Sequence, residues 1–142
     1  MGPEIPGNTG NIGRLSAGLG ARLHLVHPLG FRTDQKAVRR AGIDHWRHVD
    51  VQEHPHRAAF EDWAQGRRVL RFSAQGERPF TRASYADEDV LLFGCESVGL
   101  PQELRAGSFR IPLPGAVRSL NLSNAVAVVC YEWARHVRPE LF

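Results

Sequence analysis

The sequence predicts an α/β protein built on a parallel sheet. Short apolar runs that suit strands alternate along the chain with segments whose apolar residues recur at helical spacing, which is the order of elements in a parallel α/β sheet. The run Val90–Phe93 is continuously apolar, as expected for a strand covered on both faces. The length of 142 residues suits a single domain, residues 1–142, with a substantial core.

The first half of the chain is predicted to begin extended and then to form a capped helix. Pro3 and Pro6 disfavour helix in the residues before them, so residues 1–7 are expected to be extended. Polar residues at 8–11 then offer caps to a helix that carries Ile12, Leu15 and Leu19 and ends at Gly18 and Gly20. The further predicted elements are a strand at 22–27, a basic helix from Asp34 through Arg40 that ends at Gly42, a strand at 45–51 and a helix at 55–65.

The second half is predicted to contain three strands and two helices. The strands cover residues 68–73, 90–93 and 109–111, and a polar loop opens at Gln75 after the first of them. A brief helix begins at Pro101 and reaches Ala106. The chain is expected to end in a long helix at 122–137.

The most informative stretch runs from Ile111 into this last helix. Pro112 and Pro114 cannot donate backbone hydrogen bonds, so the strand ends at Ile111 and the chain leaves the sheet as a loop. Asn121 and its polar neighbours then offer oxygens that cap the start of the helix. Open α/β proteins place ligands in such a loop, between a strand end and a helix start, and we expect the functional site there.

The helix at 122–137 is apolar nearly all round. A terminal helix with this pattern needs cover on more than one face. A second copy of the chain would supply that cover, so we expect a homodimer formed through this helix; the alternative is a helix packed wholly within its own domain.

Composition limits the class of partner and the compartment. The formal net charge is +3 and the sequence pI is about 9.4, which suits a polyanionic partner. Nearly all of this basic charge is arginine, either because the planar guanidinium suits phosphate contacts and base stacking or because a GC-rich genome favours arginine codons. No membrane span or secretory signal is recognisable, and two cysteines make neither a disulfide framework nor a zinc pattern, so we expect a reducing cytoplasm.

Three segments, in chain order, resemble the motifs of the SPOUT superfamily of RNA methyltransferases. They read PEIPGNTGNIGR at 3–14, FGCESVGLP at 93–101, and IP through RSLNLSNA at 111–125, with shorter matches PLGF at 28–31 and RRAGID at 39–44. Within the superfamily the chain is most similar to the small single-domain tRNA (cytidine(34)-2'-O)-methyltransferases. The resemblance covers nearly the whole chain.

This resemblance implies a parallel sheet with helices on both faces and a deep trefoil knot at the C-terminal end, which is an exception to the rule that chains are unknotted. It implies 2'-O-methylation of a tRNA ribose at the wobble nucleotide 34, cytidine or a modified uridine, by a homodimer whose RNA site spans the interface. S-adenosylmethionine would lie bent in the knot, with no metal. Its implied contacts are Phe72, Gly94, Ile111 and Ser119.

The residues themselves are compatible with this cofactor. Gly94, Gly99 and Gly115 lack a Cβ and would permit the close backbone approach that an adenosyl group needs, although each could equally mark a tight turn. Neither of the glycine-rich motifs that bind phosphate-bearing cofactors is present.

By resemblance, Arg14 is the catalytic arginine. Its guanidinium stays protonated and is a poor general base, so we expect it to clamp the RNA phosphate and to stabilise the developing 2'-oxyanion. The alternative is a solvated helix charge. Further candidates for the RNA or cofactor site are Asn11, Glu96, Arg118, Asn121 and Ser123; of these, Glu96 could instead fix its loop or cap a helix, and Asn121 could instead be an N-cap.

Three features depart from the related sequences. Those sequences carry a strand before residue 3, whereas here Met1 and Gly2 precede it, so we expect a strand-wide gap in the core, from a misassigned start, a trimmed chain or an impaired copy. Cys95 stands where proline is common, which is expected to loosen that loop. Val98 replaces a frequent arginine, which would remove an RNA or interface contact.

Other functions remain open at this point. Cys95 beside Glu96 could indicate a cysteine hydrolase, although buried inert cysteine is the usual case. His45, His48, His54 and His56 have spacings that could suit a metal, or they could be solvated and core histidines. The strongest rivals are a SPOUT-like RNA-binding protein without catalysis and a methyltransferase that acts on another tRNA or rRNA position.

Overall fold

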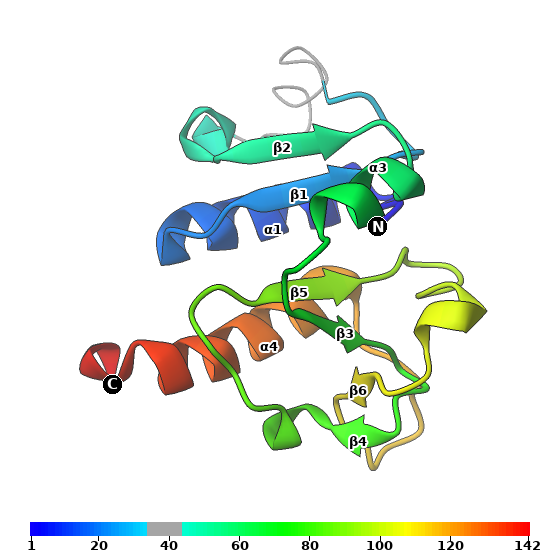
Figure 1. Cartoon of the computed structure of the whole chain (residues 1–142), viewed down its shortest axis with the longest axis vertical. Coiled ribbons are helices and arrows are strands. Elements are labelled where there is room, and N and C mark those ends of the chain that lie inside the picture. Colours follow the sequence, from blue (N-terminus) through cyan, green and yellow to red (C-terminus); the bar gives the residue numbers. More distant parts are fainter. Residues whose placement is uncertain (34–43) are drawn as a thin grey trace. The chain divides into compact units, whose positions relative to one another are not determined.

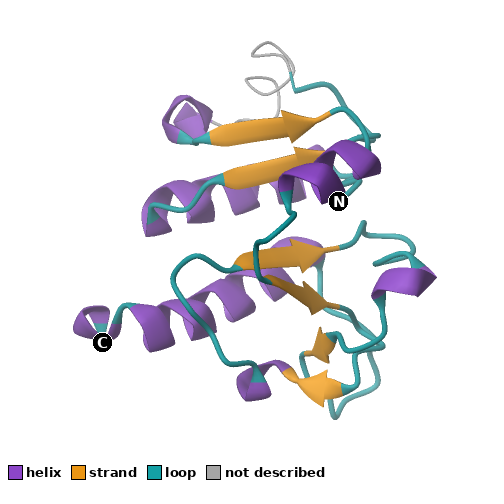
Figure 2. Cartoon of the chain, viewed as in Figure 1, coloured by secondary structure: helices purple, strands orange, loops and turns teal. Residues whose placement is uncertain are grey.

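The computed structural model describes residues 1–33 and 44–142, which form two compact units, Met1–Trp63 (unit 1) and Ala64–Phe142 (unit 2) (Figure 1). Both units combine helices with parallel strands, which confirms the predicted α/β class (Figure 2). The prediction of one sheet is wrong for the described residues, because the strands form a two-stranded and a four-stranded sheet. The predicted basic helix at 34–42 lies outside the described residues, and the organisation as one domain stays a prediction.

Unit 1 contains two parallel strands, with Leu23 of β1 (Leu23–Val26) opposite Val51 of β2 (Val51–His54). β1 confirms the predicted strand at 22–27. The amide of Gly2 donates to the carbonyl of Val26 at 2.8 Å, so the start of the described chain lies beside the end of β1. The other elements are α1 (Pro6–Leu19), the 3₁₀ helix η1 (Asp44–His48) and α3 (Arg57–Trp63), the last within the predicted helix at 55–65.

Helix α1 begins earlier than the sequence predicted. Pro6 is its first residue and Ile5 its N-cap, which makes no side-chain capping bond. Proline fits there because the first helical amides have no intrahelical acceptor. The polar residues at 8–11, which were predicted to cap the helix, therefore lie inside it, and Asn8 and Thr9 are buried. The helix ends as predicted at Gly20, whose φ of 66° is left-handed.

The predicted strand at 45–51 is wrong, because its first part forms η1. The side chains of Trp46 and Val49 both pack beside Gly13 of α1, where a Cβ would lie 2.9 Å from the Trp46 ring. The spacing of three residues between Trp46 and Val49 matches one turn of a 3₁₀ helix. The strand was predicted because Val49 and Val51 alternate as they would on one face of a strand. The ring of His45 also donates to the carbonyl of Gly10 at 3.0 Å, which fixes η1 against α1.

Unit 1 also contains a pair of contacting histidines, of which His54 is buried and His24 half-buried. His54, at the end of β2, is 3% exposed and its Nε2 lies 2.9 Å from Nδ1 of His24 on β1. The two rings stack, and Phe60 and Trp63 of α3 pack against them. The two ring nitrogens are within hydrogen-bond distance, so this contact joins the side chains of the paired strands β1 and β2.

Unit 2 contains a parallel sheet with strand order β4-β6-β3-β5. The predicted strands at 68–73, 90–93 and 109–111 correspond to β3, β5 and β6. β4 was missed because it is only two residues long and lies in the predicted polar loop. The elements are β3 (Val69–Phe72), β4 (Arg78–Pro79), η2 (Phe80–Arg82), β5 (Val90–Phe93), η3 (Gln102–Leu104), β6 (Phe109–Arg110), α4 (Leu122–Val137) and η4 (Pro139–Leu141).

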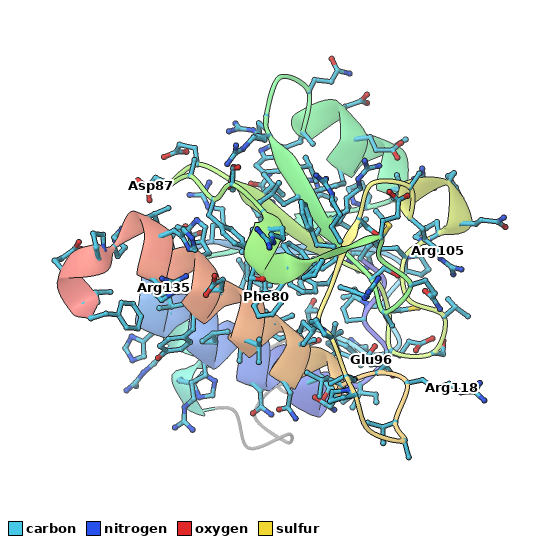
Figure 3. All side chains as sticks on the ribbon, turned by 90° about the horizontal axis from the view of Figure 1, so that it is seen from below. Phe80, Asp87, Glu96, Arg105, Arg118 and Arg135 are labelled. Carbon is cyan, nitrogen blue, oxygen red and sulfur yellow. The ribbon has the colours of Figure 1, made fainter. Side chains whose placement is uncertain are left out.

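The core of unit 2 lies between this sheet and α4. Phe72, Ala83, Phe109 and Val129 are its buried members, and Phe80 of η2 packs against them (Figure 3). Phe72 stacks on Phe93 of the neighbouring strand, with ring centroids 5.1 Å apart. Other apolar residues around this core are Leu70, Tyr85, Leu91, Phe93 and Ile111. The long terminal helix predicted at 122–137 is confirmed residue for residue.

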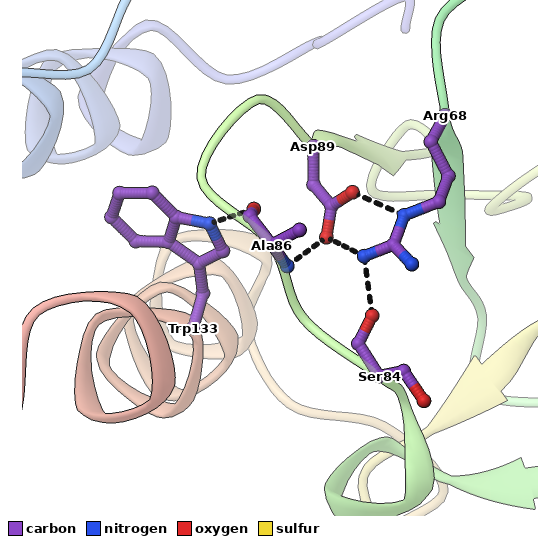
Figure 4. Close-up of polar contacts among 5 residues, drawn as sticks. All are labelled: Arg68, Ser84, Ala86, Asp89 and Trp133. Atoms are coloured by element: carbon purple, nitrogen blue, oxygen red, sulfur yellow. Dashed lines mark hydrogen bonds and ion pairs between the residues drawn. The ribbon is translucent and has the colours of Figure 1, made fainter.

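A polar network fixes the loop that precedes β5 (Figure 4). Arg68 forms a bidentate pair with Asp89, with contacts of 2.5 and 2.7 Å, and also donates to the carbonyl of Ser84. The Asp89 side chain is 1% exposed, and its carboxylate also accepts a hydrogen bond from the amide of Ala86 at 2.7 Å. Trp133 of α4 donates to the carbonyl of Ala86 at 2.9 Å, so the network joins β3, the loop and α4.

We predict that Asp89→Asn lowers the free energy of unfolding by about 1.5–3 kcal/mol, because it removes a buried charge that accepts three hydrogen bonds. Urea unfolding measures the change. The matched control is Asp87→Asn, two residues earlier, whose carboxylate pairs with Arg138 and whose side chain is 60% exposed. The control should lose less than about 1 kcal/mol; equal losses would mean that the network adds nothing beyond a surface pair.

We also predict that the stability of unit 1 depends on pH through His54. Burial lowers the pKa of His54, and a hydrogen bond with the backbone of Ala59 offsets only part of this effect. The unfolded chain therefore binds more protons below its pKa of about 6.5, so the free energy of unfolding falls as the pH drops through that value. Urea titrations at about pH 7.5 and about pH 5.5 measure the decline. In His54→Gln the free energy of unfolding should fall less between these two pH values. An equal fall in the variant and the wild type would mean that groups other than His54 cause it.

Candidate functional site

Three strands of unit 2 end at the same edge of its sheet. β3 lies between β5 and β6, with Phe72 opposite both Phe93 and Phe109. Because the strands are parallel, the segments that follow them leave the sheet on one side. The register therefore brings Phe72 and Gly94 to this edge and places Ile111 just beyond it, so three of the four predicted cofactor contacts gather there.

The segment after β5 folds into a closed loop at 94–100. A Cβ on Gly94 would lie 1.9 Å from the carbonyl carbon of Gly99, so no other residue fits at position 94 without moving the backbone. The amide of Gly99 donates to the carbonyl of Cys95 at 3.0 Å, and Gly99 itself has a left-handed φ of 72°. Leu100, which is fully buried, anchors the end of the loop. Gly94 thus has a packing role that does not depend on any ligand.

Arg105 holds the second half of this loop. It follows η3, and its guanidinium donates to the carbonyl of Leu100 through Nε at 2.8 Å and to the carbonyl of Val98 through Nη2 at 3.0 Å. The sequence reasoning missed this residue, and no local motif marks it, because the contact depends on the path of the chain between 100 and 105.

The loop from Pro112 to α4 is largely exposed. Arg118 projects from it away from the ribbon (Figure 3), and Ser119, the fourth predicted cofactor contact, is also exposed. Gly115 has open space where a Cβ would stand, so its predicted close approach is not required by any protein neighbour in the described residues. By contrast, Ile111 is half-buried and packs against the core. The exposed side chains of this loop thus lie on a segment that begins at a residue fixed by the core.

Asn121 is the N-cap of α4. Its Oδ1 accepts from the amide of Ser123 at 2.9 Å and from the amide of Asn124 at 3.4 Å. Ser123 is buried, and its hydroxyl donates to the same oxygen at 2.7 Å. Of the two roles left open for Asn121, the structure therefore gives the capping role, and it gives Ser123 a supporting one.

The remaining candidates are distributed between the units. Arg14 and Asn11 lie in unit 1, exposed and three residues apart on α1, so they share one face of that helix. Glu96 is half-buried in the 94–100 loop of unit 2 (Figure 3). The predicted meeting of Arg14 with the cofactor loops stays a prediction.

The rival chemistries find little support in the described residues. The contacts that Cys95 Sγ makes within the described part of the chain are with Ser97 Oγ and the carbonyl of Gly99, each at 3.8 Å, and neither is with a histidine. Burial raises the pKa of Cys130 to about 12, so this thiol stays protonated. Across residues 1–33 and 44–142, no group of three or more His, Cys, Asp or Glu side chains could hold a metal ion. Nor does any helix there have the length and apolar character to span a membrane.

Comparison with known proteins finds relatives that are all RNA methyltransferases. The chain matches the SpoU rRNA Methylase family over residues 1–131. It is 42% identical over 140 residues to a tRNA (cytidine(34)-2'-O)-methyltransferase of Methylovorus glucosotrophus, covering 94% of this chain and 91% of that protein. A structure solved to give insights into "the 2-OH methylation of C/U34 on tRNA" has a TM-score of 0.88 and 49% identity, covering 94% of this chain and 90% of that one.

A second solved structure is that of an AdoMet-bound rRNA methyltransferase from Sinorhizobium meliloti. It has a TM-score of 0.80 and 29% identity, over 93% of this chain and 52% of that one. The matches span both units and all three motifs on which the resemblance was based, so the predicted relationship is confirmed. This chain belongs to the SpoU rRNA methylase family, within the SPOUT methyltransferases.

Proposed function

We propose that this chain transfers a methyl group from S-adenosylmethionine to the ribose 2'-hydroxyl of nucleotide 34 of tRNA, either cytidine or a modified uridine. The observation that carries the proposal is the 42% identity, over nearly the whole length of both chains, to a protein named for that reaction. The similar structure at 49% identity was solved in connection with the same methylation. Action on tRNA would take place in the cytoplasm.

The edge of the sheet in unit 2 suits S-adenosylmethionine. An adenosyl group is neutral and needs apolar walls together with backbone donors and acceptors, and Phe72, Ile111 and the 94–100 loop offer both. We propose that Gly94, Ile111 and Phe72 contact the cofactor mainly through their backbones and that Ser119 contacts it from the exposed loop. When bound, the cofactor would supply the electrophilic methyl group. The AdoMet-bound relative supports this choice of cofactor.

We propose that Arg14 binds the RNA. Its guanidinium is exposed on α1, and a permanently charged fork suits a phosphate oxygen and the negative charge that develops on the 2'-oxygen during transfer. Arg14 cannot accept the proton from the hydroxyl, so water or another group would take it. Arg118 and Asn11 are proposed as further RNA contacts, because both side chains are exposed.

We further propose that the C-terminal segment is threaded as a deep trefoil knot and that the protein is a homodimer. The similarity to SPOUT methyltransferase structures supports the knot. An exposed apolar stripe on α4 supports the dimer: Val128 is 38% exposed and Tyr131 53% exposed, one turn apart, and Phe142 packs edge-on against Tyr131. Helix α4 buries its opposite face through Val126, Val129 and Trp133.

The proposed methyl transfer makes a direct prediction. Incubation of the wild-type protein with tRNA and S-adenosylmethionine should produce 2'-O-methylated nucleotide 34, which nucleoside mass spectrometry of tRNA fragments detects. Arg14→Ala should lower kcat/KM by about 100-fold or more, as expected for loss of a charged group that stabilises the transition state. Arg22→Ala is the control, because Arg22 lies in an exposed pair with Asp50.

The outcomes separate the rival functions. Binding of tRNA without any methylated product would favour an RNA-binding protein without catalysis. Product at another tRNA or rRNA position would keep the methyl transfer and overturn the assignment to nucleotide 34. Equal product from Arg14→Ala and wild type would remove Arg14 from the mechanism.

The proposed dimer makes a prediction of its own. Val128→Glu should raise the dimer dissociation constant by about 100-fold or more, because it would bury a charge in an apolar interface. Val128→Thr, which has nearly the same shape and no charge, is the matched control. Sedimentation velocity over a concentration series measures both variants, and a wild-type protein that stays monomeric would refute the dimer.

A further inference from the structure

Arg105 joins two peptide groups of the loop that we propose for the cofactor. Its Nε donates to the carbonyl of Leu100 at 2.8 Å and its Nη2 to the carbonyl of Val98 at 3.0 Å. These carbonyls lie on either side of Gly99, the residue of the loop with a left-handed φ. One planar guanidinium therefore fixes the backbone on both sides of the most freely rotating residue of the loop.

Val98 lies at the exposed tip of this loop. The Val98 side chain is 67% exposed, so packing contributes little to its position. Leu100 is fully buried and fixed by the core, and the amide of Gly99 is bonded to Cys95. The bond from Arg105 to the Val98 carbonyl thus completes a chain of contacts from the core to the exposed tip of the loop.

We propose that Arg105 is a positioning residue for the cofactor, which it affects by holding the 94–100 loop in its closed form before the cofactor binds. The inference rests on the proposed function, since it assumes that this loop binds S-adenosylmethionine. Arg105 itself bonds to protein carbonyls and is not assigned a contact with the substrate. Fixing the loop in advance lowers the conformational entropy lost on binding, so its absence weakens affinity for the cofactor.

Arginine is suited to this role and lysine much less so. The guanidinium presents several N–H groups in one plane and can serve two carbonyls at once, whereas an ammonium on a flexible chain is a single point donor. Arg105→Met removes the donors but keeps an unbranched apolar side chain of similar length. Arg105→Lys keeps the charge and one donor, so it should fall between the wild type and Arg105→Met.

The test uses the full-length protein in two measurements. Without cofactor, hydrogen exchange of the amide of Gly99 should accelerate by about 5- to 30-fold in Arg105→Met, corresponding to the loss of one or two kcal/mol of local stability. Isothermal titration with S-adenosylmethionine should show a dissociation constant raised by a similar factor of about 5- to 30-fold. In methyl-transfer assays the KM for the cofactor should rise, while kcat at saturating cofactor and the KM for tRNA stay within about two-fold of wild type.

The control is Arg22→Met, which removes an exposed guanidinium of unit 1 and should change none of these quantities. If Arg105→Met does not fold, Arg105→Lys carries the test through the same measurements. Unchanged Gly99 exchange and cofactor affinity would overturn the proposal, as would a rise in the KM for tRNA with unchanged cofactor affinity, which would make Arg105 an RNA contact. A wild-type protein that fails to bind S-adenosylmethionine would instead refute the proposed function and this inference with it.

Discussion

The site in unit 2 depends on one close approach between two stretches of backbone. Gly94, directly after β5, lies very near the backbone of Gly99 and Leu100. A Cβ at position 94 would overlap with that backbone. This contact folds the chain back on itself at the edge of the sheet, and the fully buried Leu100 keeps it there. Since close-packed backbone cannot yield by changing a rotamer, the loop has one compact form, and its exposed peptide groups have fixed directions.

The same edge of the sheet is formed with backbone groups and apolar side chains rather than with charges. Phe72 belongs to the core and Ile111 packs against it, whereas the guanidinium of Arg105 is engaged with two carbonyls of the 94–100 loop. Arg118 is exposed and projects away from the ribbon (Figure 3). This edge therefore offers backbone groups and apolar surface to a ligand, and the exposed Arg118 stands in the loop that follows β6.

The sequence predicted those parts of the molecule that local chemistry determines. The α4 boundaries followed from Asn121 and from the prolines before it, and the strands at 68–73, 90–93 and 109–111 followed from apolar runs bounded by polar residues. The errors lie where tertiary contacts decide the local structure. Trp46 packs on Gly13, so a segment with a strand-like pattern became η1, and β4 forms only because the chain at Gly76 lies against Phe109. A contact such as that of Arg105 has no local signal, because its partners are backbone carbonyls, which every residue has.

Two residues of the 94–100 loop that were expected to depart from related sequences, Cys95 and Val98, both make contacts through their backbone carbonyls. Cys95 was expected to loosen the loop because it replaces a proline, yet the Cys95 carbonyl accepts the amide of Gly99, and its sulfur lies 3.8 Å from the Gly99 carbonyl. Val98 offers no charged side chain, yet its carbonyl is held by Arg105. In both cases the contact is made by a peptide group that is present whatever the side chain. The closed form of this loop therefore depends on the space at Gly94, the conformation of Gly99 and the donors that reach the loop from Arg105.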